Sequence, residues 1–235
     1  MRAAIMQPYI FPYIGYFNLI HASDFFVFYD DVNYVKKGWV NRNRMLNKGA
    51  GDGMLFTLPV EKASRNKVIS EIKPLVSPKW KNSFYNKLYY NYKKAPFFGE
   101  VVDVLMDPFS KDYSDISGLI AESFVSIYSY LNVEFEFFRS SVLSPETRGL
   151  DKADRLIEIT KKAGADVYVN APGGEEIYSK EYFNGKGVKL LFVKPEIREY
   201  DQGVESFVPW LSIIDVLMFC SKVDVKYLMS SYTLE

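Results

Sequence analysis

Short, continuously apolar runs alternate with amphipathic stretches along this chain, and this alternation predicts an α/β fold. Runs at 3–6 and 25–29 have the unbroken apolar character of strands in a parallel sheet that is covered on both faces. The last third continues the rhythm, with strands expected at 133–138, 167–169 and 188–193. Strands that alternate with helices in this way predict a Rossmann-like, mostly parallel sheet.

The middle of the chain has a helical pattern instead. Apolar residues recur every four positions from Trp80 to Tyr92, and a second apolar stripe runs through 114–132. This spacing places apolar side chains on one face of a helix. We therefore expect a single α/β domain over residues 1–235, with a helical insertion at about 79–132.

Three further elements are expected from shorter patterns. Residues 54–60 and 68–74 have the content of strands, the second at a sheet edge, and residues 207–220 are expected to form a buried helix. Asp215 is the charged residue inside that helix. Because a buried carboxylate is costly without a partner, we expect it to pair with a basic residue or a backbone amide.

A rigid aromatic loop is expected after the first strand. Pro8 and Pro12 fix φ and lack a backbone donor, so neither a helix nor a central strand passes through them, and Gly15 permits a tight turn. Open α/β sheets bind ligands beyond the carboxyl ends of their strands. The residues that we expect to bind a ligand here are Gln7, Tyr9, Tyr13 and Tyr16. The alternative is a proline-braced packing turn.

Two carboxylates, Asp30 and Asp31, follow the second expected strand and so belong to the same edge of the sheet as the aromatic loop. Carboxylates in this position can act as a general base, as metal ligands or as acceptors for ribose hydroxyls. The alternative is a solvated strand end that caps the next turn. We predict that Asp30 or Asp31 is the catalytic residue, without a metal ion.

A basic cluster comes next in the chain. Four cations lie between Lys36 and Arg44, and the whole chain carries no net charge, which favours a small anionic ligand over a polyanion. Arginine can bind phosphate or carboxylate through two parallel hydrogen bonds, and lysine adds a point charge. The binding residues expected here are Lys37, Trp39, Asn41, Arg42 and Arg44. The alternative is a solvated basic loop.

A glycine pair marks a second turn that follows a strand. Asn170 precedes Pro172, Gly173 and Gly174, and a short helix is expected after them. Free backbone amides in such a turn can bind a phosphate group. Two adjacent glycines also mark an ordinary tight turn, so both interpretations stay open. Asn170, Gly173 and Gly174 complete the set of predicted binding residues.

The composition excludes several classes of protein. The 29 Lys and Arg residues balance the 29 Asp and Glu residues, so we expect no nucleic-acid partner. One cysteine and one histidine exclude an intrachain disulfide and a metal site built from several such ligands, and the sequence identifies no cofactor. The chain has no apolar run long enough for a membrane span and no signal-peptide pattern, which predicts a cytoplasmic protein. Cys220 has apolar neighbours, so we expect a buried thiol with a raised pKa rather than a nucleophile.

Several of these runs resemble the WbqC-like protein family. The resemblance covers essentially the whole chain and is carried by Gln7–Phe17, Phe26–Val32, Lys36–Arg44, Arg155–Ile159, Tyr168–Gly174 and Phe207–Asp215. The family resembles proteins encoded with surface-polysaccharide (O-antigen) and amino-sugar biosynthesis. The resemblance therefore implies a transferase that moves an amino-acid or acyl group onto the amine of a nucleotide-linked amino sugar. An acyl or aminoacyl carrier is a further candidate partner, because Lys36 and Lys37 could instead bind its phosphopantetheine.

A fainter likeness in layout connects the first strand, the run Tyr13-Ile-Gly-Tyr16 and the short helix after it to nucleotidyltransferases that bear a HxGH motif. Both histidine positions of that motif are tyrosine here. A phenol can donate a hydrogen bond to phosphate, but it supplies no imidazolium at neutral pH. The layout agrees with a Rossmann-like fold, and a diverged nucleotidyltransferase stays an alternative function.

The working hypothesis is a transferase that acts on a sugar nucleotide. In it, the cations of the basic cluster hold the pyrophosphate, while Tyr13 and Tyr16 pack against and hydrogen-bond the sugar or its donor. Asp30 or Asp31 takes a proton from the attacking amine, which requires a carboxylate within hydrogen-bond reach of that amine. The competing hypothesis is a non-catalytic protein that binds a sugar nucleotide or organises a complex.

Overall fold

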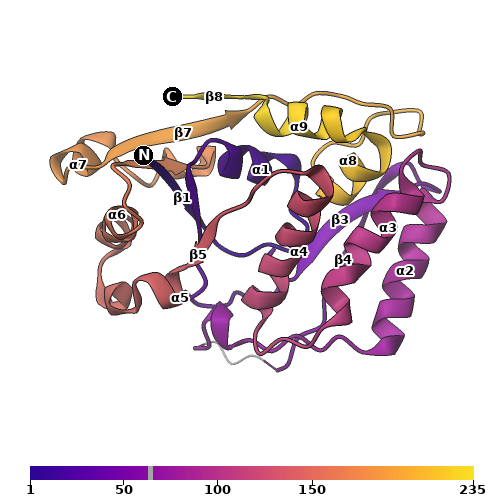
Figure 1. Cartoon of the computed structure of the whole chain (residues 1–235), viewed down its shortest axis with the longest axis horizontal. Coiled ribbons are helices and arrows are strands. Elements are labelled where there is room, and N and C mark those ends of the chain that lie inside the picture. The colour runs from indigo at the N-terminus through magenta and orange to yellow at the C-terminus, as the bar shows by residue number, and fades with distance from the viewer. Residues whose placement is uncertain (63–65) are drawn as a thin grey trace.

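A six-stranded sheet organises the computed structural model, which describes residues 1–62 and 66–235 (Figure 1). The strand order is β5-β2-β1-β6-β7-β8, with five parallel strands and an antiparallel β8 at one edge. The strands are β1 Arg2–Met6, β2 Phe25–Phe28, β5 Phe137–Arg139, β6 Val167–Asn170, β7 Lys189–Pro195 and β8 Tyr232–Leu234. The predicted mostly parallel α/β sheet is confirmed, and its parallel strands follow the Rossmann order.

Helices cover both faces of this sheet. On one face, Ala4 and Phe26 share a core with α1 (Ile14–His21), α4 (Ile116–Leu131) and α9 (Lys222–Ser230). On the other face, Ala3 and Val27 pack with α6 (Lys152–Lys162) and α7 (Lys180–Gly185). Successive strand side chains point to opposite faces, so strands that are buried on both faces must be apolar throughout. This explains the continuous apolar runs.

A helical layer and a hairpin lie beside the sheet, at the right of Figure 1. The helices are α2 (Pro78–Tyr92), α3 (Phe98–Met106) and α4, and the antiparallel hairpin consists of β3 (Arg42–Asn47) and β4 (Asp52–Thr57). Pro96 precedes α3 and marks the break between the first two helices. The short elements are α5 Ser140–Leu143, η1 Ile69–Glu71, η2 Asp107–Ser110, η3 Pro145–Gly149 and η4 Pro172–Gly174.

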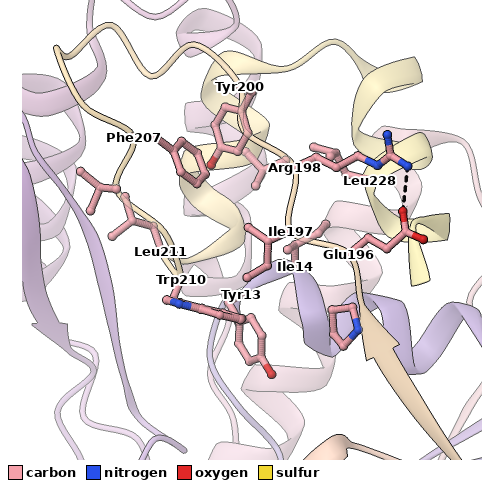
Figure 2. Close-up of a pocket in the computed structure, with 13 residues that line it drawn as sticks. Tyr13, Ile14, Glu196, Ile197, Arg198, Tyr200, Phe207, Trp210, Leu211 and Leu228 are labelled. Atoms are coloured by element: carbon pink, nitrogen blue, oxygen red, sulfur yellow. Dashed lines mark hydrogen bonds and ion pairs between the residues drawn. The ribbon is translucent and has the colours of Figure 1, made fainter. Parts of the chain in front are cut away.

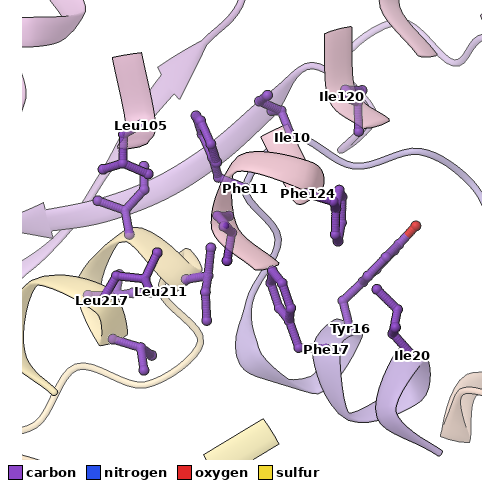
Figure 3. Close-up of a cluster of buried hydrophobic side chains, with 14 of the residues drawn as sticks. Ile10, Phe11, Tyr16, Phe17, Ile20, Leu105, Ile120, Phe124, Leu211 and Leu217 are labelled. Carbon is purple, nitrogen blue, oxygen red and sulfur yellow. The ribbon is translucent and has the colours of Figure 1, made fainter. Parts of the chain in front are cut away.

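Part of the aromatic loop belongs to the core (Figure 3). Phe11 has φ of +42° and is fully buried, and its ring stacks on Phe84 with 6.3 Å between centroids. Tyr16 and Phe17, from α1, pack on Phe124 of α4 at 5.6 and 5.3 Å. Positive φ is rare for an aromatic residue and persists only where the surroundings impose it. The core therefore fixes the loop, which leaves Tyr9 and Tyr13 only partly buried.

Two expected elements differ from the structure. Residues 68–74 form no strand, because the Glu71 carboxylate folds back to accept the Val68 backbone N–H at 3.1 Å and closes the turn η1. The helix expected over 207–220 is α8, which spans only Ile213–Phe219. Pro209 lacks a donor and Trp210 has φ of +62°, so the chain before Ser212 cannot be helical.

Neither the hairpin strand β3 nor the last two elements, α9 and β8, was expected from the pattern. Among the residues that the structure describes, no helix is both long and apolar enough to cross a bilayer.

Candidate functional site

Asn43 of β3 holds the aromatic loop in place. Its buried amide donates to the carbonyl oxygens of Phe11 and Ile10, and its Oδ1 accepts from the Tyr9 hydroxyl at 2.9 Å and from the Arg44 backbone N–H at 2.7 Å. One side chain thus satisfies two carbonyl groups of the loop and fixes the Tyr9 hydroxyl. Asn43 is not among the predicted binding residues; its signal is the alternation Asn-Arg-Asn-Arg, which places Asn43 on the inner face of a strand.

The segment before α8 locks the same loop from the other side. The Ser212 hydroxyl donates to the Phe11 carbonyl at 2.6 Å, the Ser212 N–H to Arg44 O at 2.8 Å, and the Ile213 N–H to Pro12 O at 2.7 Å. Figure 2 shows the consequence for the side chains: the Trp210 ring lies edge-on against Tyr13, with 5.8 Å between centroids. Both rings line a narrow, mostly apolar cavity of about 30 Å³.

Tyr13 also lines a larger cavity, which we call the aromatic lobe and which has a volume of about 440 Å³. The side chain of Trp39 is 51% exposed at this site. Its lining comprises Met6, Gln7, Pro8, Tyr9, Tyr13, Gly15, Tyr16, Leu19, Val35, Gly38, Trp39, Val40 and Ala171. A Cβ at Gly15 would lie 2.3 Å from Tyr13 Cε2, so glycine is required where this ring crosses the backbone.

A second cavity, the phenol lobe, has a volume of about 350 Å³. Its lining comprises Ile5, Met6, Gln7, Tyr29, Leu156, Tyr168, Asn170, Ala171, Gly173, Gly174, Ile177 and Tyr178. A Cβ at Gly174 would lie 2.2 Å from Asn170 Nδ2, whereas one at Gly173 would meet nothing within 4 Å. The glycine pair therefore has unequal parts, because Gly174 makes room for the Asn170 amide and Gly173 does not.

The two lobes meet at Met6, Gln7 and Ala171, which line both. Met6 ends β1, and Ala171 follows β6, the strand that pairs with β1 on the side away from β2. The chain leaves β1 toward β2 and later returns to its other side, so the crevice between β1 and β6 is the topological switch point of the sheet. Ligands of open α/β sheets bind at this position. We call the two lobes together the cleft.

Charge lies beside the cleft rather than in it. Of the described residues that line either lobe, none has a charged side chain. A more open hollow of about 470 Å³, the basic hollow, is lined by Tyr34, Lys36, Lys37, Asn41, Arg42, Thr57, Val60, Glu61 and Lys62. The Arg42 Nε donates to Gly38 O at 3.0 Å, and its guanidinium lies 5.7 Å from the Trp39 ring. Arg42 thus braces the turn that separates the basic hollow from the aromatic lobe.

Asn41 and Arg44 of the predicted basic cluster also have internal contacts. Asn41 is buried, accepts from the Tyr34 hydroxyl at 2.8 Å and donates to Leu58 O at 2.7 Å. The Arg44 guanidinium packs against Gly53 of the hairpin, where a Cβ would come within 2.5 Å of it. Lys37 is exposed and lines the basic hollow with Arg42. The structure therefore brings Lys37 and Arg42 together, whereas Arg44 lines none of the three spaces.

Asp30 lies at the end of β2, fully buried and surrounded by donors. Its Oδ2 accepts from Arg139 Nε at 2.6 Å and from the Ser141 hydroxyl at 3.0 Å, and its Oδ1 accepts from the Ser141 N–H at 3.0 Å. Arg139 also donates to Asp115 at 2.8 Å. These contacts tie β2 to β5 and α5.

Asp31, like Asp30, is bonded to a guanidinium group and to a serine hydroxyl. Its Oδ2 lies 2.5 Å from Arg155 Nη2, and its Oδ1 accepts from the Ser140 hydroxyl at 2.5 Å. Both Asp31 and Arg155 are buried. Neither Asp30 nor Asp31 lines the cleft or the basic hollow. The general-base role of these carboxylates stays a prediction, and the structure adds that each already has a guanidinium partner.

The phenols of the aromatic lobe are neutral hydrogen-bonding groups. Burial raises the pKa of Tyr9, and the nearby Arg42 and Arg44 lower it by less. Burial also raises the pKa values of Tyr13 and Tyr16. The Tyr16 hydroxyl donates to Gln7 O at 2.7 Å and is not free for a ligand.

Two buried groups lie outside the cleft. Burial raises the pKa of Asp215, whose Oδ2 accepts from the Tyr200 hydroxyl and from Gln202 Nε2, each at 2.7 Å. The expected partner, a basic residue or a backbone amide, was wrong, because neutral side-chain donors fill that place. For Cys220 the expectation is confirmed: it is buried, and burial raises its pKa to about 12. Among the described residues, no group of three or more potential metal-ligating side chains is found.

Comparison with known proteins places these features in a family. The family model for the WbqC-like protein family matches residues 7–227, which include all residues that line the cleft except Ile5 and Met6. The chain is also 28% identical, over 92% of its length and 92% of the relative's, to "Uncharacterized protein Rv1507c" of Mycobacterium tuberculosis. No solved structure matches the chain. The chain belongs to the WbqC-like protein family.

Proposed function

We propose that this protein binds a nucleotide-linked amino sugar in the cleft and transfers an acyl or aminoacyl group to its amine. The observation that carries the proposal is the meeting of two cavities at the ends of β1 and β6, the switch point of the sheet. Each lobe has a volume within the range of small-molecule sites, and together they offer room for a substrate with two chemically different parts.

The three spaces suit different parts of such a substrate. The aromatic lobe offers Trp39 and Tyr9, which lie 6.1 Å apart between ring centroids, as faces for a planar base or the apolar face of a sugar. The phenol lobe offers hydroxyl and amide groups for sugar hydroxyls. The basic hollow, with Lys37 and Arg42, offers positive charge to a phosphate group at the far side of the turn.

The proton chemistry of this proposal differs from the working hypothesis. To accept a proton from an amine, Asp30 or Asp31 would have to give up a guanidinium and serine hydroxyls that now stabilise its charge. We therefore propose that both carboxylates support the strand ends. The amine's proton then passes to solvent or to a group on the second substrate, since the cleft stands open to water.

A second candidate function is non-catalytic binding of a sugar nucleotide. It is favoured by a specific observation: among the described residues that line the cleft there is no carboxylate, histidine, cysteine or lysine. Phenols and amides bind well and are poor general bases at neutral pH. By contrast, the positions of Tyr13 and Tyr16 give the nucleotidyltransferase alternative no support, because one ring is packed on Gly15 and the other hydroxyl is bonded internally.

The test begins with a thermal-shift screen of nucleoside diphosphate hexosamines, followed by mass spectrometry of each hit with acyl and aminoacyl donors. A ligand at 100 times its Kd stabilises the fold by about 2.7 kcal/mol. A Trp39→Ala variant should lose the shift, whereas Tyr90→Ala, which removes an aromatic side chain that is 73% exposed on α2, should keep it. Binding without transfer of an acyl or aminoacyl group from any donor would favour the non-catalytic candidate. If no probe bound, both the transferase and the non-catalytic binding function would be excluded.

A further inference from the structure

Three residues form a connected chain from the buried carboxylates to the phenol lobe. Asp31 accepts from Arg155 Nη2 at 2.5 Å, and the Arg155 guanidinium lies over the ring of Tyr29, 4.7 Å from its centroid. Tyr29 in turn lines the phenol lobe and is only partly buried. The chain therefore leads from a fully paired interior charge to a side chain that can meet a ligand.

The guanidinium of Arg155 has no freedom to turn away. Its Nε donates to Thr147 Oγ1 at 3.3 Å while its Nη2 is held by Asp31, and Asp31 is held in turn by the Ser140 hydroxyl. The buried pair thus presents a fixed positive charge to one face of the Tyr29 ring. A cation beside a phenol favours negative charge on the phenol oxygen, which makes the O–H a stronger hydrogen-bond donor.

The surroundings of Tyr29 define the chemistry of the ligand. Tyr168 and Tyr178 are the other phenols of the lobe, Asn170 supplies a carboxamide, and Gly173 exposes backbone. Burial raises the pKa of Tyr29, and the charge of Arg155 opposes this shift by less, so the phenol is a neutral donor near pH 7. A lining of neutral donors and acceptors without charge matches the hydroxyl-bearing part of a sugar ring rather than a phosphate or a carboxylate.

We propose that Tyr29 donates a hydrogen bond to a hydroxyl or acetamido oxygen of the pyranose ring bound in the phenol lobe, with Arg155 and Asp31 as its positioning residues. This inference rests on the proposed function, because it names the part of the sugar nucleotide that enters the phenol lobe. It assigns Asp31 a role in binding that acts through another residue and requires no proton transfer to the carboxylate.

Calorimetry of the Tyr29→Phe variant tests the contact. The probes are uridine and thymidine diphosphate hexosamines and the matching free nucleoside diphosphates. Loss of one hydrogen bond should weaken the hexosamine conjugates roughly threefold to tenfold and leave the free diphosphates unchanged. The matched control is Tyr182→Phe, which removes a hydroxyl that donates to Asp154 at an exposed site on α7 outside the cleft.

The possible outcomes separate the two proposals. If wild type binds the conjugates and Tyr29→Phe binds them equally well, the inference is overturned and the proposed function stands. If Tyr29→Phe weakens the free diphosphates as much as the conjugates, the sugar does not occupy the phenol lobe and the inference is again overturned. If wild type binds none of the probes, the proposed function fails and the inference fails with it.

A second measurement tests the positioning role without any ligand. In protein labelled with 3-fluorotyrosine, the fluorine signal of Tyr29, assigned through Tyr29→Phe, reports the titration of its phenol. Asp31→Asn removes the charge that offsets Arg155, so the midpoint for Tyr29 should move to lower pH, while that of Tyr182 stays. A purely structural Asp31 would change thermal stability and leave the Tyr29 midpoint in place, which would overturn its assignment as a positioning residue.

Discussion

The cleft and the carboxylate pair behind it lie at the ends of adjacent strands, yet they are opposite in chemistry. The end of β1 leads into two cavities without a charged lining side chain, whereas the end of β2 carries two carboxylates that are buried and ion-paired. These two carboxylates are already bonded to the protein, whereas Tyr9, Tyr13 and Trp39 of the cleft are left partly or largely accessible. In this fold, therefore, unfilled space and buried charge lie at different strand ends, and we propose the unfilled space as the ligand site.

The largest effect is expected when one of the ion-paired carboxylates at the end of β2 is removed. Asp30→Ala removes the partner of Arg139 from a fully buried position and should lower the free energy of unfolding by roughly 3–5 kcal/mol. Urea denaturation measures the change, and Asp112→Ala, at an exposed position, is the matched control. Activity and binding should fall only as far as the folded fraction falls.

Asparagine variants then decide between support and general base. If Asp30→Asn or Asp31→Asn lowered turnover about 10²–10⁴-fold while stability stayed unchanged, the carboxylate would be the base and its pairing a resting state. We expect the reverse pattern, with melting temperature and activity declining together.

The next largest effect concerns the glycine pair, Gly173 and Gly174, of the accessible phenol lobe. Gly174→Ala places a Cβ against the Asn170 amide and 3.2 Å from Phe192, so it should displace Asn170 from the phenol lobe and cost about 1–3 kcal/mol of stability. Gly173→Ala meets nothing within 4 Å and should be nearly neutral. Thermal unfolding of the two variants, with ligand titration, gives the comparison. Equal behaviour of the two alanines would contradict the unequal parts assigned to the glycine pair.

Trp39 tests the aromatic lobe with a smaller expected cost to the fold. Because half of its surface is exposed, Trp39→Ala should change stability little, but it should weaken a ligand whose base stacks on the ring by about 1–3 kcal/mol. Calorimetric Kd values for wild type and variant provide the measurement. A ligand bound equally well by both proteins would have to lie outside the aromatic lobe.

The smallest effect concerns Cys220. Its folded-state pKa of about 12 exceeds that of an unfolded thiol, so its contribution to stability is complete below about pH 8.5 and is lost as pH rises toward 12. The stability difference between wild type and Cys220→Ala should therefore shrink above pH 8.5, by up to about 1.4 kcal/mol per pH unit. Urea unfolding at pH 7.5 and pH 9.5 measures it, and a constant difference would show that the thiol is not shielded.

Much of the sheet was predictable because strands that are buried on both faces have continuous apolar sequences. Ala3–Met6 and Phe25–Phe28 are apolar at every position, and the structure pairs them as parallel neighbours. The hairpin strand β3 was missed for the opposite reason. Its sequence, Arg-Asn-Arg-Met-Leu-Asn, has the polarity of a loop. The hydrogen bonds that Asn43 makes inside the protein compensate for burying its polar side chain in the strand.

The candidate site was predictable in its parts and not in their grouping. Strand order and loop composition direct Gln7, Tyr13 and Asn170 to one edge of the sheet, where the structure has them lining adjoining cavities. The sequence pattern does not say which charges find partners, because those partners come from distant segments. Arg139 and Arg155 lie more than a hundred residues beyond the carboxylates that they neutralise.

The locking of the aromatic loop by Ser212 bears on how the protein is made. Ser212 lies 201 residues beyond Phe11, and Leu228 and Met229, whose carbonyl groups accept from Asn18, lie 210 and 211 residues beyond that asparagine, so these anchors are synthesised long after the loop. A nascent chain therefore carries an unanchored loop until these later segments have been made. A fragment that ends before Ser212 retains the N-terminal motif without the hydrogen bonds that fix the loop.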